Sequence, residues 1–106
     1  MVRVRLSSLS NNCLQFEVEG HAGHGKKGTD PVCAAISVLT LTFLNGLERE
    51  LQAEIVGHFD DGECSVEITV IKEKSNDLNL LTKVFRYGFE RLVREFPDCL
   101  VLENRN

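Results

Sequence analysis

The chain has 106 residues, of which 42% are hydrophobic and 26% are charged, which is typical of a single globular domain with one core. Its net charge of −4 argues against a nucleic-acid-binding protein, because such proteins usually carry a basic excess. No long apolar run predicts a signal peptide or a membrane-spanning helix, so we expect a cytoplasmic protein with no direct nucleic-acid partner and no membrane partner. In that compartment the four cysteines, Cys13, Cys33, Cys64 and Cys99, are expected to be reduced.

Four strands are predicted from alternating apolar and polar residues. They cover residues 2–6, 14–18, 54–59 and 64–70. The turn sequences Ser10-Asn11-Asn12 and Asp60-Asp61-Gly62 separate the members of each pair. Each pair is therefore predicted to form a β-hairpin.

Two helices are predicted from apolar residues at helical spacing. The first runs from Pro31 to about Leu51 and is apolar almost all round in its first four turns, so it must be covered on most sides. Because a domain of this length has little to cover it with, we expect a homodimer through this helix. The second helix follows the capping residues Asn76-Asp77 and stops before Pro97, and residues 100–102 form a short last strand.

The resulting order of elements is ββαββαβ over a single domain of residues 1–106. Two hairpin signals favour antiparallel pairing, and helices with an apolar face can all pack on one side of such a sheet. The sequence therefore predicts an α+β fold, in which two helices pack on one face of an antiparallel β-sheet.

The segment that leads into the first helix carries the candidate chemistry. Asp30 is a favoured helix N-cap residue and Pro31 suits the first helical position, which places Cys33 at the third helical position. Free N–H groups and the positive end of the helix dipole stabilise a thiolate there, and they can also stabilise an oxyanion. His21 begins the intervening glycine-rich loop, and a thiolate beside a base is the arrangement of cysteine-nucleophile catalysis. Ser37 lies one turn after Cys33 on the same helix face.

These residues resemble a known family, the ribosomal-processing cysteine proteases called Prp. The resemblance is carried by Gly20-His21-Ala22-Gly23 and by Gly28-Thr29-Asp30-Pro31-Val32-Cys33-Ala34-Ala35-Ile36-Ser37. It implies a catalytic dyad of Cys33 as nucleophile and His21 as base, with Asp30 and Ser37 as supporting residues. It also implies a substrate: the large-subunit ribosomal protein twenty-seven, whose N-terminal extension the family removes in some bacteria.

The supporting residues allow more than one role. Asp30 is interpreted first as the helix cap and second as a residue that orients His21. Ser37 is predicted either to pack or form a hydrogen bond within the helix, or to bind the substrate. Gly20, Gly23 and Gly28 allow the loop to approach an extended peptide closely, and they are candidate substrate-binding residues.

Two further interpretations of the sequence stay open. A non-catalytic module that binds a ribosomal protein, or assists ribosome assembly, would not need both His21 and Cys33. A metal site could use His21, His24, Cys33 and His58, although His-x-x-His in a glycine-rich loop is not a standard ligand spacing. The resemblance implies neither a metal nor another cofactor.

Overall fold

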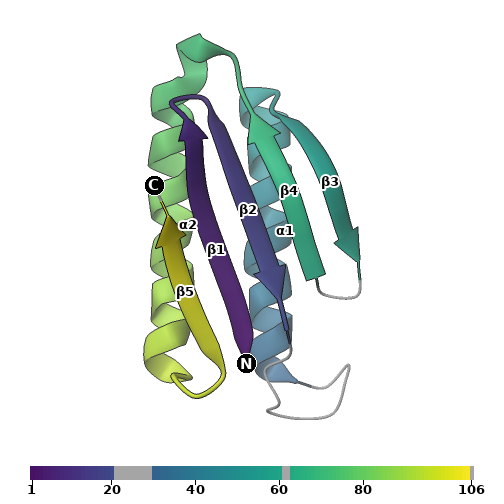
Figure 1. The fold of residues 1–106 in the computed structure, drawn as a ribbon, viewed down its shortest axis with the longest axis vertical. Helices are drawn as coiled ribbons and strands as arrows, with labels where there is room; N and C mark the ends of the chain where they lie inside the picture. Colours follow the sequence, from purple (N-terminus) through teal and green to yellow (C-terminus); the bar gives the residue numbers. More distant parts are fainter. Residues whose placement is uncertain (21–29, 61–62, 106) are drawn as a thin grey trace.

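The structure, a computed structural model, describes residues 1–20, 30–60 and 63–105. Its elements are β1 (Val2–Ser10), β2 (Cys13–Glu19), α1 (Pro31–Leu51), β3 (Glu54–Asp60), β4 (Glu63–Thr69), the short 3-10 helix η1 (Lys72–Lys74), α2 (Ser75–Glu95) and β5 (Leu100–Arg105). Figure 1 shows their arrangement. The predicted order ββαββαβ is confirmed.

The five strands form one sheet in the order β3-β4-β2-β1-β5. Three of its pairings are antiparallel, as predicted, but β5 pairs parallel with β1, from Val2 opposite Leu100 onwards. The expectation of a purely antiparallel sheet is therefore corrected in this one pair. The cause is α2, which carries the chain from the end of β4 back to the opposite end of the sheet, so that the next strand must run in the direction of β4 and β1.

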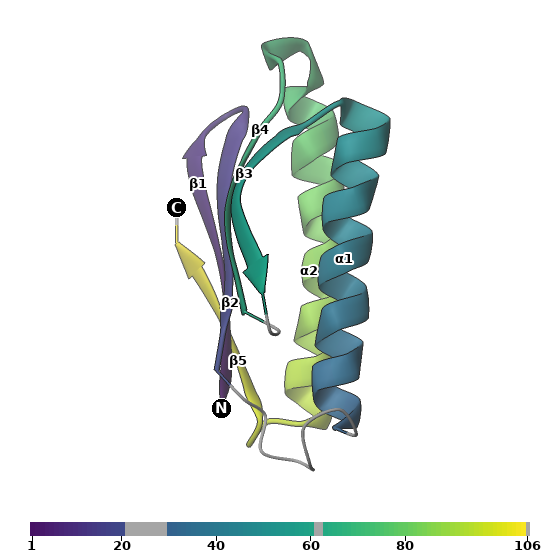
Figure 2. The same ribbon diagram turned by 90° about the vertical axis from the view of Figure 1, so that its right-hand side faces the viewer.

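The core lies between the sheet and the two helices, which cover the same face of the sheet (Figure 2). Phe16 of β2 is completely buried at its centre. Its ring centroid lies 5.5 Å from that of Phe43 in α1 and 6.0 Å from that of Phe89 in α2. One aromatic cluster therefore joins the sheet to both helices, at spacings that favour edge-to-face and tilted contacts.

Helix α1 has the predicted bounds but is buried along one stripe rather than on most sides. The stripe consists of Val32, Ile36, Thr40, Phe43, Leu44, Leu47 and Leu51. Outside it, Val38 is 64% exposed and Leu41 is 44% exposed. By length and composition α1 is also the one helix among the described residues that is apolar enough to cross a bilayer, contrary to the expectation from the sequence. Its buried stripe nevertheless packs into the hydrophobic core.

Helix α2 begins before the predicted cap. The chain enters it through η1, where Lys74 N donates to Ile71 O at 2.9 Å, and Lys74 occupies the N-cap position without a side-chain bond to the helix. Asn76 and Asp77 therefore lie inside the first turn and do not cap it. The 3-10 turn takes the place of a side-chain cap, a common arrangement at helix ends.

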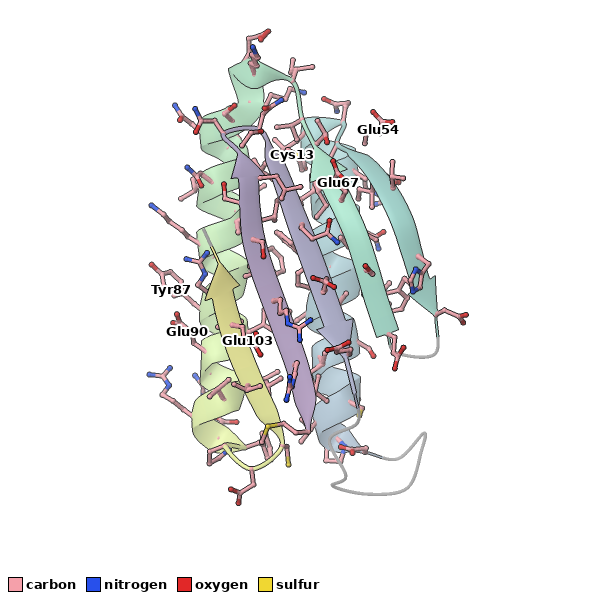
Figure 3. The ribbon with its side chains drawn as sticks, viewed as in Figure 1. Cys13, Glu54, Glu67, Tyr87, Glu90 and Glu103 are labelled. Carbon is pink, nitrogen blue, oxygen red and sulfur yellow. The ribbon has the colours of Figure 1, made fainter. Side chains whose placement is uncertain are left out.

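On the second face of the sheet polar side chains gather, among them Cys13, Glu54, Glu67 and Glu103 (Figure 3). The charged side chains on this face include six glutamates and one aspartate but two arginines: Glu17, Glu19, Glu54, Asp60, Glu63, Glu67 and Glu103, with Arg3 and Arg5. Arg5 pairs with Glu19 at 3.0 Å and with Glu103 at 3.2 Å, and its hydrogen bond to Glu103 is the main cause of its raised pKa. This sheet face is therefore acidic.

Candidate active site

Helix α1 begins at a side-chain cap. Asp30 has extended backbone angles, φ −75° and ψ 115°, and its Oδ1 accepts hydrogen bonds from Val32 N at 2.9 Å and Cys33 N at 3.3 Å. Only 6% of Asp30 is exposed, and Pro31 follows it at the start of the helix. The predicted cap is present, and its negative charge lies at the positive end of the helix dipole. It fixes the position of the first turn.

Cys33 lies in this first turn and carries a free thiol. The residue is partly buried and packs against the hydrophobic core. Ser37, one turn later on the same helix face, is also partly buried. Cys33 is therefore held by the core on one side without being fully buried.

The N–H groups of this first turn already have acceptors. Pro31 has none to donate, Val32 and Cys33 donate to Asp30 Oδ1, and Ala34 N donates to Asp30 O at 3.1 Å. The expectation that free helix N–H groups hold an oxyanion is therefore corrected, because the cap occupies them. The 3.3 Å bond from Cys33 N is longer than usual, so this N–H is the one that a competing acceptor displaces most easily.

Gly20 directly follows the end of β2 and immediately precedes His21 in the sequence. Its φ is +97°, and a Cβ at this position would lie 2.3 Å from the carbonyl oxygen of Met1. Glycine is therefore favoured both by the backbone angle and by the close approach of the chain start, a contact that the sequence alone did not reveal. His21, Gly23 and Gly28 lie outside the described residues, so their roles, and the pairing of His21 with Cys33, stay predictions.

Of the other three cysteines, two lie in the core and one lies on the central strand β2. Cys64 and Cys99 are 3% and 8% exposed. Cys13 begins β2 on the acidic sheet face, where its Sγ lies 3.3 Å from Glu67 Oε1 and 3.3 Å from Thr69 Oγ1. Cys33 therefore differs from the other cysteines in being a partly buried residue at a helix N-terminus.

The metal-site interpretation concerns His21 and His24, which lie outside the described residues, together with Cys33 and His58. His58 is exposed on the edge strand β3. Within residues 1–20, 30–60 and 63–105, no three His, Cys, Asp or Glu side chains come together in a group that could hold a metal ion.

The sequence model of the cysteine protease Prp family matches residues 1–101. The chain belongs to this family. It is therefore a cysteine protease, which the resemblance of the motif around Cys33 had implied.

Solved structures share the fold. A ribosomal processing protease Prp from S. aureus, in complex with a covalently linked product peptide, is 18% identical, with a TM-score of 0.78 over 99% of this chain and 100% of that one. The same S. aureus protease with a substrate peptide is also 18% identical, with a TM-score of 0.71 over 99% and 100% of the two chains. The protein SMU.848 from Streptococcus mutans is 27% identical, with a TM-score of 0.72 over 99% and 94%. No curated protein matches the chain.

Replacement of Asp30 should separate its capping role from any other role. Asp30→Ala is expected to lower the free energy of unfolding by about 1 kcal/mol, because two N–H groups lose their acceptor, whereas Asp30→Ser should restore most of that loss. Urea denaturation measures both. If Asp30 acts only as a cap, Asp30→Ser keeps the wild-type kcat/KM. A Ser variant that is stable but poorly active would instead show that the carboxylate serves the reaction.

The buried thiol of Cys64 should be unreactive in the folded protein. Burial raises its pKa from 9.0 to about 11. Peptide mapping after iodoacetamide treatment at neutral pH is expected to find Cys33 modified, and Cys64 modified only after denaturation. Since the unfolded chain ionises Cys64 first as the pH rises from 9 towards 11, this group should lower the stability of the fold over that range. Rapid modification of Cys64 in the folded protein would contradict its burial.

Proposed function

We propose that this protease removes the N-terminal extension of the large-subunit ribosomal protein twenty-seven through an acyl-enzyme intermediate. The observation that carries the proposal is the partly buried residue Cys33 in the capped first turn of α1, at the end of the molecule where β2 also ends (Figure 1). The motif around it resembles that of the ribosomal-processing proteases. The S. aureus protease with the same fold is known in complexes with substrate and product peptides, which supports a peptide substrate.

In the proposed reaction His21 takes the proton of the Cys33 thiol, and the thiolate attacks the carbonyl carbon of the scissile peptide bond. The tetrahedral intermediate collapses when His21 donates the proton to the leaving amine, which releases the C-terminal product. Water, deprotonated by His21, then attacks the thioester and frees Cys33 and the N-terminal product. In this second step His21 passes the proton of the water to the departing Sγ of Cys33, so that the thiol and the neutral imidazole are both restored.

The oxyanion in both steps needs hydrogen-bond donors, and the structure limits which ones α1 can supply. Val32 N donates to Asp30 at 2.9 Å, whereas Cys33 N donates at 3.3 Å and its peptide unit adjoins the nucleophile. We assign Cys33 N–H as the donor from α1, released from Asp30 as the negative charge develops on the substrate oxygen. This exchange keeps one of the two cap bonds, so the helix start is preserved.

Charge supports a basic peptide as substrate. The chain carries 16 acidic and 12 basic residues, and its open sheet face bears six glutamates and Asp60 as well as Arg3 and Arg5. A basic segment of a ribosomal protein is attracted by such a field before it contacts the active site. Cleavage should therefore slow as ionic strength rises, mainly through KM.

The test is mass spectrometry of the organism's own ribosomal protein twenty-seven, as translated from its gene, after incubation with the wild-type enzyme and separately with Cys33→Ala. Loss of one defined N-terminal segment with the wild type only is the expected result. An uncut substrate with both proteins would reject the proposed substrate. A substrate that is bound but not cut by the wild type would favour a ribosomal-protein-binding role instead.

The proposal includes a cytoplasmic location, which a ribosomal substrate requires, and a homodimer through α1. Support for the dimer comes from Val38 and Leu41, large apolar residues that α1 leaves exposed outside its buried stripe.

A charged residue introduced on the exposed apolar side of α1 should dissociate the dimer. Val38→Glu is expected to shift the mass measured by light scattering from dimer to monomer, because the carboxylate would be buried at the interface. The matched control is Leu80→Glu on α2, since Leu80 is 61% exposed and Val38 is 64% exposed. A wild-type protein that is monomeric at micromolar concentration would contradict the proposed dimer.

A further inference from the structure

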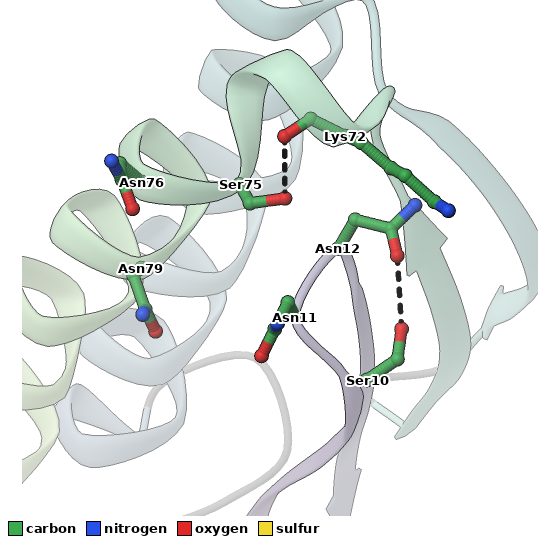
Figure 4. A pocket seen from close by; sticks show the side chains of 7 residues that line it. All are labelled: Ser10, Asn11, Asn12, Lys72, Ser75, Asn76 and Asn79. Atoms are coloured by element: carbon green, nitrogen blue, oxygen red, sulfur yellow. Dashed lines mark hydrogen bonds between the residues drawn. The ribbon is translucent and has the colours of Figure 1, made fainter.

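Two adjoining hollows lie between the β1–β2 turn and the first half of α2, at the opposite end of the molecule from the start of α1 (Figure 1). The larger, a cleft of about 590 Å³, is lined by Ser10, Asn11, Asn12, Lys72, Ser75, Asn76 and Asn79 (Figure 4). The smaller has a volume of about 60 Å³, and Arg86 is part of its wall. Ser10, Asn11 and Asn79 line both, so the two hollows are direct neighbours.

Arg86 is an arginine without a hydrogen-bond or ion-pair partner in the part of the chain that the structure describes. Its side chain is partly buried, and its Nε is buried without any hydrogen bond. Among the residues that the structure describes, Arg5 and Arg91 form ion pairs with glutamates, but Arg86 forms none. Leaving a buried donor of a charged group unsatisfied is unfavourable, and a bound anion or ordered water is the usual explanation.

The surroundings of Arg86 select for negative charge. Among the described residues, the side chains that line the two hollows include the cations Arg86 and Lys72 and not one carboxylate, although the chain has 16 acidic residues. The amides of Asn11, Asn76 and Asn79 form no hydrogen bond with the described residues and are available as donors and acceptors. In contrast, Asn12 is engaged, since it donates to Val70 O at 2.8 Å and accepts from Ser10 Oγ at 3.0 Å.

The sizes of the hollows fit a small ligand with one anionic group. The smaller hollow has room for several waters or one compact oxyanion. The larger cleft falls within the range of small-molecule sites, and its amide-rich lining suits a molecule with many hydroxyl groups. A long polyanion such as RNA is disfavoured, because the chain is acidic overall and its open sheet face would repel further phosphates.

We propose that this second site, away from Cys33, binds a small phosphorylated molecule. Its phosphate occupies the smaller hollow against Arg86, whose planar guanidinium donates hydrogen bonds to phosphate oxygens in pairs. Lys72 adds positive charge at the rim, and the polar remainder of the ligand contacts Asn11, Asn76 and Asn79 in the larger cleft.

The probes are inorganic phosphate and glucose 6-phosphate, each titrated at constant ionic strength into 15N-labelled wild-type protein. The reporter is the NMR signal of the Arg86 Nε–H group, which the structure leaves unpaired. A saturable shift is expected for both probes, with tighter binding of glucose 6-phosphate because it also reaches the cleft. Acetate at the same ionic strength should produce no saturable shift.

Three variants test the assignment. Arg86→Gln should weaken phosphate binding by roughly tenfold or more, since a charge-assisted pair is lost. The matched control is Arg91→Gln on the same helix, because Arg91 is exposed and paired with Glu95; it should leave binding unchanged. Asn76 is exposed and lines only the larger cleft. Asn76→Ala should therefore weaken the binding of glucose 6-phosphate and leave the binding of inorganic phosphate unchanged.

The proposal would be overturned by an Arg86 Nε–H signal that does not respond to either phosphate probe, because the donor would then be satisfied by water alone. Equal responses to acetate and phosphate would also reject it. If Arg86→Gln does not fold, Lys72→Gln, at an exposed position, serves in its place and should weaken the binding of both probes.

Discussion

Cys33→Ala is expected to lose peptide hydrolysis by about four orders of magnitude or more while it keeps the wild-type fold. The physical reason is that the Sγ atom forms the covalent bond of the acyl-enzyme, and no other group in the first turn of α1 can replace it. The helix start does not depend on this side chain, because Asp30 caps it through the backbone N–H groups of Val32 and Cys33. The measurement is kcat/KM on a peptide that spans the cleaved bond.

Cys13→Ala is the matched control, because Cys13 is the other partly buried thiol and lies on the acidic sheet face. It should keep wild-type activity. His21→Ala should lower kcat to a similar extent as Cys33→Ala, and the double variant should lose little more than either single variant, since residues that act as one unit are not additive. Activity within tenfold of the wild type in Cys33→Ala would rule out the acyl-enzyme mechanism.

Local signals explain why the start of α1 was predictable. An aspartate that accepts from the next backbone N–H groups, followed by a proline that has none, specifies a helix start within four residues, independently of the rest of the fold. The observed cap at Asp30 and the start of α1 at Pro31 agree with this prediction. Alternation in residues 2–6 and 14–18 likewise specified which strand residues are buried, since a change of register would turn every side chain over.

Non-local features escaped prediction for the opposite reason. The parallel pairing of β5 with β1 depends on the path of α2 across the sheet, and nothing within residues 100–105 encodes it. The start of α2 depends on a 3-10 turn that replaces the Asn76-Asp77 cap. The predicted cap at Asp30 also accepts hydrogen bonds from the N–H groups of Val32 and Cys33. The sequence alone did not show that these N–H groups are therefore not free to bind an oxyanion.

The core and the active site share one helix. The first turn of α1 carries Cys33, and later turns of the same helix bury Phe43 and Leu47 against the sheet. A nucleophile on a rigid element is placed more precisely than one on a loop, because its position follows from core packing. Loss of packing at the centre of the core is therefore expected to affect both the stability of the domain and the placement of the thiol.

Phe16→Ala tests this connection and should be the most destabilising single change considered. Phe16 is completely buried, and its ring contacts the rings of Phe43 in α1 and Phe89 in α2. Truncation removes the transfer free energy of the ring and leaves a cavity between three elements, at a cost of about 3–5 kcal/mol. Since a domain of this kind has a total stability of about 5–15 kcal/mol, the variant should be close to unfolding at room temperature.

The measurement is urea denaturation of Phe16→Ala beside Phe59→Ala, a matched control because Phe59 is 38% exposed on the edge strand β3. The control should lose no more than about 1 kcal/mol, because little of its apolar area leaves water on folding. If Phe16→Ala folds at all, hydrogen exchange in α1 should accelerate together with that in β2 and α2, because the same ring contacts join all three. A loss of stability in Phe16→Ala no larger than in the control would mean that the aromatic cluster does not couple the sheet to the helix that carries Cys33.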